Sequence, residues 1–133
     1  MSKIETNVIT RGHTSGGAER EVVNTLQDCY KRFESKAPYK IEIVIVQTET
    51  MMHDFLRNEK FRLNITTSDD EESFCFYDSW HGYPRITVSL DKLANFTKLA
   101  RKGALRHEAA HSVLHGSLEF RIFKISHECQ QIG

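Results

Sequence analysis

The stretch that decides the fold is Ala104-Leu105-Arg106-His107-Glu108-Ala109-Ala110-His111-Ser112-Val113-Leu114-His115. It contains no proline and no glycine, and most of its apolar residues are leucine or alanine, which favour helices. Gly116 follows directly, and glycine is common just beyond the last turn of a helix. The sequence therefore predicts an α-helix that ends near Gly116.

Within this predicted helix, His107, Glu108 and His111 form the pattern HExxH. Residues four apart lie on one helix face, about one turn (~5.4 Å) from each other, so both imidazoles can reach one metal ion. Glu108 is rotated by ~100° from His107 and points beside that ion, where a carboxylate can take a proton from the attacking water. We predict Zn²⁺ held by His107 and His111, with Glu108 as general base. The alternative is a surface helix whose histidines have this spacing by chance.

The sequence does not identify the third protein ligand of the metal uniquely. A catalytic zinc site usually has three protein ligands and one open position. His115 extends the row of histidines, but ~12 Å of helix rise separates it from His107, so we interpret it as a packing residue. Glu119 follows the helix too closely to fold back, whereas Glu128 leaves enough chain for a turn and a returning helix. We favour Glu128, with His127 as a further option, and the remaining alternative is a ligand absent from this chain.

The rest of the chain alternates between strand and helix patterns. Apolar residues at steps of three and four predict helices at 18–33, 50–57 and 93–105, with a possible break at Lys102-Gly103, and another helix after Ser117. Strands are predicted at 41–46, 74–77 and 85–90, and residues 78–84 are predicted to connect the last two as a hairpin. Residues 1–15 are expected to be a loose lead-in, and residues 68–73 an acidic loop. This order predicts one α+β domain over residues 1–133, with a small mixed sheet packed on helices.

Composition narrows the classes of partner. The 133 residues include 18 basic and 18 acidic side chains, so no overall field attracts nucleic acid or an anionic membrane. No stretch approaches the ~20 apolar residues that span a bilayer, and the first residues lack the apolar core of a signal peptide. The three cysteines include no CxxC pair. We expect a cytoplasmic protein that binds neither nucleic acid nor membrane, and the oligomeric state stays open.

On these residues the chain resembles the zincin metallopeptidases, and within them small gluzincin-type domains, in which HExxH often continues into a Leu-His pair. Here the continuation is Leu114-His115-Gly116, and the resemblance covers residues 74–116. It implies the roles given above for the HExxH residues. It also implies that the strand from Arg85 to Leu90 borders the cleft and pairs with an extended peptide substrate. The glutamate ligand of that family has only the candidates already named.

The expected function is therefore hydrolysis of peptide bonds in a peptide or protein substrate by a zinc metallopeptidase. His81 or Tyr83, at the predicted hairpin tip, is a candidate hydrogen-bond donor to the oxyanion of the tetrahedral intermediate. The alternative for both is an aromatic turn residue that packs on its own hairpin. The alternative function is an inactive or latent zincin-like binding or regulatory module whose metal is structural or weakly held.

Overall fold

The computed structural model describes residues 5–33, 40–66 and 74–113. The elements follow the order β1 (Glu5–Arg11), α1 (Gly16–Phe33), β2 (Lys40–Val46), α2 (Glu49–Arg62), β3 (Cys75–Asp78), β4 (Arg85–Ser89) and α3 (Leu90–Leu93). A further helix at residues 98–113 contains the HExxH pattern and is called the HExxH helix below. The predicted α+β class and mixed sheet are confirmed.

The sheet has the strand order β1-β2-β4-β3. β1, β2 and β4 are parallel, and β3 runs antiparallel to β4. Because β4 is hydrogen-bonded to β2 on one side and to β3 on the other, it has no free edge for an added strand. The expectation that residues 85–90 pair with a substrate is therefore wrong. Among the described strands, the outer one on that side of the sheet is β3.

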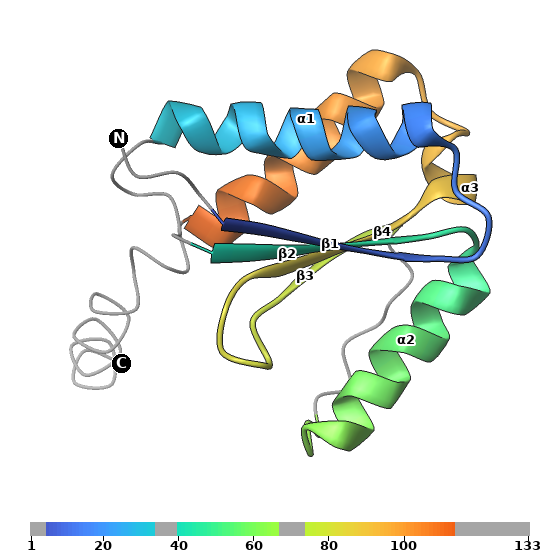
Figure 1. The fold of residues 1–133 in the computed structure, drawn as a ribbon, viewed down its shortest axis with the longest axis vertical. Coiled ribbons are helices and arrows are strands. Elements are labelled where there is room, and N and C mark those ends of the chain that lie inside the picture. Colours follow the sequence, from blue (N-terminus) through green and yellow to red (C-terminus); the bar gives the residue numbers. More distant parts are fainter. Residues whose placement is uncertain (1–4, 34–39, 67–73, 114–133) are drawn as a thin grey trace, which may run out of the picture.

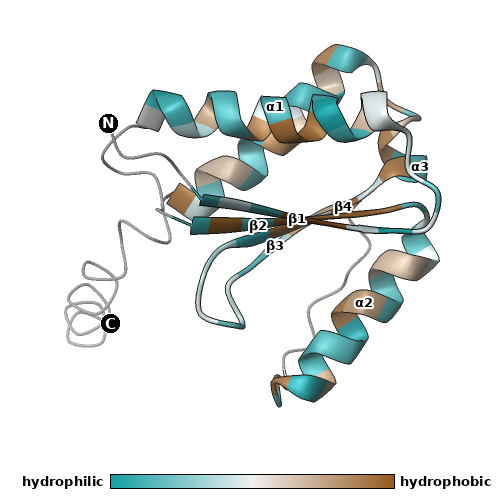
Figure 2. Cartoon of the chain, viewed as in Figure 1, coloured by the Kyte–Doolittle hydropathy of each residue, from teal (hydrophilic) through white to brown (hydrophobic). Residues whose placement is uncertain are grey.

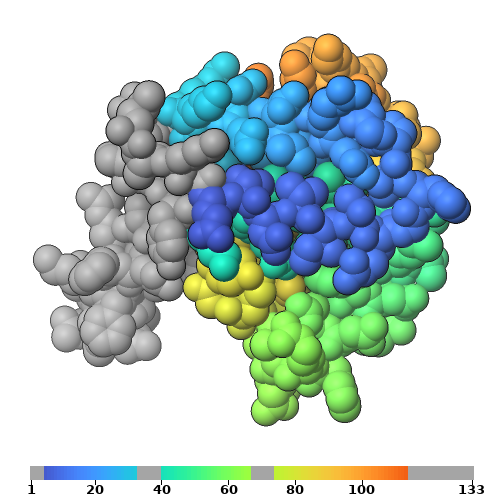
Figure 3. Space-filling model, viewed as in Figure 1, coloured from blue at the N-terminus to red at the C-terminus, as the bar shows by residue number. Residues whose placement is uncertain are grey.

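The expected loose lead-in at residues 1–15 is also wrong over Glu5–Arg11, which forms strand β1. β1 pairs in parallel with β2 along its whole length, from Glu5 opposite Lys40 to Arg11 opposite Val46. Most of its side chains are exposed because it is an outer strand, so it lacks the apolar alternation that would have indicated it. In Figure 3 it lies between α1 and α2 on one face of the molecule.

Helices cover both faces of the sheet: α1 and the HExxH helix lie on one, and α2 on the other (Figure 1). Two hydrophobic clusters fill these layers, and Figure 2 shows the hydrophobic colours along the sheet. The cluster beneath α1 and the HExxH helix consists of Val22, Leu26, Cys29, Tyr30, Ile41, Ile43, Ile45, Cys75, Ile86, Val88, Leu93, Leu105, Ala109 and Val113. The cluster beneath α2 consists of Val44, Val46, Met52 and Leu56.

Capping residues explain two differences from the predicted helices. α2 is longer than expected and begins after Thr48, whose side chain accepts a hydrogen bond from the Met51 amide. The HExxH helix begins after Thr97, whose hydroxyl accepts from the Ala100 amide at 3.2 Å. It continues through Gly103 without the break expected at Lys102-Gly103. The chain leaves the helical conformation earlier, between α3 and Thr97.

Several expectations lie outside the described residues: the helix end near Gly116, the helix after Ser117 and the whole acidic loop at 68–73. Within the described ranges, no helix combines the length and the apolar character needed to cross a membrane.

Candidate metal centre

His107 and His111 are brought together on the exposed side of the HExxH helix. Their Nε2 atoms are 3.0 Å apart, and their rings meet edge to face at 89° with centroids 4.5 Å apart. Two nitrogen ligands of one tetrahedral ion, each at ~2.0–2.1 Å from it, would lie ~3.3 Å apart. The two imidazoles therefore have nearly the spacing of a shared ion, and they fit zinc as nitrogen donors.

Packing on the opposite side of the helix gives the histidines this orientation. Leu105, Ala109 and Val113 are spaced four residues apart and are at most 2% exposed. They belong to the cluster that also contains Ile86 and Val88 of β4. Because these residues fix one face of the helix on the sheet, the face that carries the histidines points away from it.

Two polar contacts hold the same helix against α1. The Ser112 hydroxyl donates to the Ala109 carbonyl at 2.7 Å, and the Tyr30 hydroxyl lies 2.7 Å from Ser112 Oγ, to which it can donate. Burial raises the pKa of Tyr30, which keeps this hydroxyl protonated. Near the start of the helix, the Arg101 guanidinium donates two hydrogen bonds of 2.8 Å to the Glu21 carboxylate. The helix is thus fixed to α1 on both sides of the HExxH pattern.

Glu108 is half-buried beside the histidine pair. Burial raises the pKa of its carboxyl, and the nearby His111 and His107 act against that shift. Burial is the main reason that the pKa of the Cys75 thiol on β3 is raised, and the Glu108 carboxylate is close enough to contribute to that shift. Because burial raises its pKa, the Glu108 carboxylate is a stronger base than an exposed one.

The predicted third ligand is not tested by the described residues. His115, Glu119, His127 and Glu128 all lie outside them. Over 5–33, 40–66 and 74–113, no three side chains of His, Cys, Asp or Glu form a group that could hold a metal ion. The assignment to Glu128 stays a prediction.

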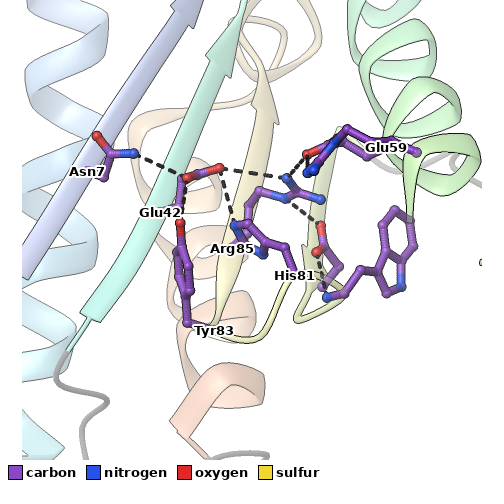
Figure 4. A network of polar contacts seen from close by, with 9 residues as sticks. Asn7, Glu42, Glu59, His81, Tyr83 and Arg85 are labelled. Atoms are coloured by element: carbon purple, nitrogen blue, oxygen red, sulfur yellow. Dashed lines mark hydrogen bonds and ion pairs between the residues drawn. The ribbon is translucent and has the colours of Figure 1, made fainter. Parts of the chain in front are cut away.

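The structure does not bring His81 and Tyr83 to the histidine pair. Tyr83 donates to Glu42 Oε2 at 3.1 Å, and His81 Nε2 lies 3.5 Å from Glu42 Oε1 (Figure 4). Glu42 alternates along β2 with Ile41 and Ile43, which face the HExxH helix, so its side chain points to the α2 face. Both residues therefore contact a side chain on the α2 face of the sheet, and the oxyanion role predicted for them has no contact in support and stays a prediction.

Arg85 joins this second group of polar side chains and was not singled out by the sequence. It is fully buried, its Nε donates to Asp78 Oδ2 at 3.0 Å, and its Nη1 donates to Glu59. Glu42 Oε1 lies 3.7 Å from Nη1, and Asn7 donates to the other oxygen of Glu42 at 3.2 Å. The available signal was Glu42 itself, a charged residue inside an apolar strand that needs a partner when it is buried.

Comparisons of the chain with models of protein families, with curated proteins and with solved structures found no match.

Proposed function

We propose that this protein is a zinc-dependent metallopeptidase. The observation that carries the proposal is the 3.0 Å separation of the His107 and His111 Nε2 atoms on an exposed helix face, with a half-buried glutamate beside them. Two nitrogen donors at this spacing and an adjacent carboxylate are the parts that metal-assisted hydrolysis needs. Glu128 completes the proposed set of ligands.

The chemistry is divided between the metal and the chain. Bound zinc supplies Lewis-acid polarisation of the scissile carbonyl and of the attacking water. Glu108 accepts the proton of that water on its carboxylate and transfers it to the leaving amine. Burial supports this role because a carboxyl with a raised pKa holds the proton more readily between the two transfers.

The proposed substrate is an extended peptide that pairs with β3. The Glu108 carboxylate acts electrostatically on Cys75 of this strand, and β3 is the outer strand next to β4 among the described strands. Backbone groups on the outer edge of a strand can form a ladder with an added peptide. The sequence predicted that the substrate pairs with the strand that forms β4, and we propose that it pairs with β3 instead.

The test compares wild type with Glu108→Gln in hydrolysis of a peptide library after loading with zinc. Glutamine keeps the size of the side chain and cannot act as a base, so we expect zinc binding to persist and kcat/KM to fall by at least ~10³-fold. Glu49→Gln is the matched control, since Glu49 lies in the first turn of α2 and interacts with Lys92. Equal hydrolysis by Glu108→Gln and wild type would refute the mechanism. Stoichiometric zinc without hydrolysis of any peptide would favour the binding or regulatory module.

A further inference from the structure

A small hollow lies between α1 and the HExxH helix, and neither of the two histidines is part of its lining. Its volume is about 40 Å³, and its lining consists of Thr25, Asp28, Cys29, Arg32, Lys102 and Arg106. Thr25 and Cys29 are 6% and 8% exposed and form its inner part. Each helix therefore contributes cationic side chains to one small concave surface.

The three cations of the hollow are held only loosely by other side chains of the described part of the chain: the Glu21 carboxylate acts on Lys102 electrostatically without forming an ion pair with it. Arg32, Lys102 and Arg106 make no hydrogen bond or ion pair there, whereas the neighbouring Arg101 is fully engaged by Glu21. The exposed Asp28 is the single acidic side chain in the lining. The hollow thus carries three cationic side chains against the single carboxylate of Asp28, although the chain as a whole has equal numbers of acidic and basic residues.

The buried thiol of Cys29 lies close to these positive charges. Burial raises the pKa of Cys29, and Arg106 and Arg32 both act against that shift. Two guanidinium groups from different helices therefore lie close enough to act on one atom at the base of the hollow. Such convergence favours an anion bound between them.

Size and donor chemistry indicate which anion fits. A water-sized group needs ~10–15 Å³ of such space, so 40 Å³ accommodates about three of them, comparable to the oxygens that one phosphate presents. Arginine donates in a planar fork that matches two phosphate oxygens, and lysine adds a point charge. A larger anion would extend into solvent.

We propose that this hollow binds a phosphate group, either inorganic phosphate or the phosphate of a small phosphomonoester, through Arg32, Lys102 and Arg106. The ligand bridges α1 and the HExxH helix and therefore stabilises their packing. The proposal does not rest on zinc or on the proposed peptidase activity, because none of the lining residues belongs to the HExxH pattern.

Calorimetric titration with inorganic phosphate at constant ionic strength tests the proposal. We expect saturable binding, weakened about tenfold or more by Arg106→Ala and by Arg32→Ala, since each removes a charged donor. Asp28→Asn should tighten binding a few-fold, because it removes a negative charge from the rim. Lys31→Ala is the control for a general loss of charge, because Lys31 is exposed on α1 outside the lining, and it should change affinity less than about twofold.

Two further titrations identify which site and which form of phosphate account for the measured binding. His111→Ala should bind phosphate as well as wild type does, which separates this site from phosphate held by a bound metal. Titration with O-phosphoserine or glycerol phosphate then shows whether the free anion or a phosphomonoester binds more tightly. The proposal is overturned if wild type shows no saturable phosphate binding, if Lys31→Ala weakens binding as much as Arg106→Ala, or if an oligonucleotide binds and phosphate does not.

Discussion

Arg85 is a fully buried cation that contacts the carboxylates of Asp78, Glu59 and Glu42 on the α2 face of the sheet (Figure 4). Removing a single partner from such a group leaves a buried charge uncompensated, which usually costs more than the intact pair contributes. Arg85 Nη2 and both ring nitrogens of His81 have no hydrogen-bond partner among the described residues. The group therefore joins β2, β4 and α2. Its contribution to the free energy of unfolding depends on whether its carboxylates are ionised.

Glu59 gives this group a measurable pH dependence. Hydrogen bonds from Arg62 and then Arg85 lower the pKa of Glu59 to about 2, against 4.5 without these contacts. Because the folded-state pKa is depressed, the stabilisation is fully present above pH ~4.5 and is lost as the pH falls towards ~2. Allowing for the exposed Arg62 partner, we expect ~1–2 kcal/mol of unfolding free energy to disappear in this window.

Urea unfolding at a series of pH values measures this effect. Glu59→Gln removes the titrating group, so its unfolding free energy should fall less steeply between pH ~4.5 and ~2 than that of wild type. Asp54→Asn is the control, since Asp54 is 58% exposed and pairs with an exposed arginine. Identical slopes for wild type and Glu59→Gln would contradict the assignment.

At the residue scale, the histidine pair could be predicted from sequence because helix geometry alone sets the distance between positions four apart. The side on which Glu108 lies could not be fully predicted, since its proximity to Cys75 depends on how the helix packs on β3. The contacts of His81 and Tyr83 with Glu42 could not be predicted for a similar reason. Hairpin membership says nothing about which face of the sheet a side chain at the tip will meet.

At the scale of elements, the HExxH helix is positioned by close packing at Ala109. This residue is fully buried against the sheet, whereas Ala110 is half-buried. Ala109→Leu adds volume where none is free, so we expect the unfolding free energy to fall by ~1–3 kcal/mol. Ala110→Leu is the matched control with an expected change below ~1 kcal/mol. Equal effects in chemical denaturation would show that Ala109 is not the contact that fixes the helix.

Gly103 weakens the same helix without serving its packing. A Cβ built at this position meets no atom within 4 Å, so Gly103→Ala should raise the unfolding free energy by ~0.5–1 kcal/mol through lower backbone entropy in the unfolded chain.

Gly12→Ala should lower the unfolding free energy, and chemical denaturation measures both glycine variants. Gly12 has φ +80°, and a Cβ there would lie 2.7–2.9 Å from atoms of Gln47 and Met51. For the Gly103→Ala variant described above, a lower unfolding free energy than that of wild type would contradict the prediction. It would mean that the helix is interrupted at Gly103.

Whether a helix or strand could be predicted from the sequence depends on how much of it is buried. α1 and β2 were found because their apolar residues recur with a clear period and face a core. β1 was missed because an outer strand needs few apolar residues, and its pairing with β2 is a long-range property. The start of the HExxH helix was misjudged because the Thr97 cap decides it, and Gly103 is tolerated once neighbouring turns are buried.

At the scale of the molecule, the sheet separates two chemically different sides. The HExxH helix and α1 share the larger hydrophobic cluster, with the histidine pair facing outward, and the Arg85 group lies beneath α2. Changes in the Arg85 group should therefore alter stability far more than the affinity for a metal. The class of fold was predictable from the order of elements, whereas the position of β4 inside the sheet was not, because strand order depends on pairing between distant segments.

The most direct test of the central claim is the ratio of zinc to protein after loading with zinc and dialysis, measured by elemental analysis. We expect about one zinc per chain for wild type and for His53→Ala, whose histidine lies on α2 beside Glu49. We expect almost none for His107→Ala and His111→Ala. Wild type without zinc, or His111→Ala with as much zinc as wild type, would contradict this claim.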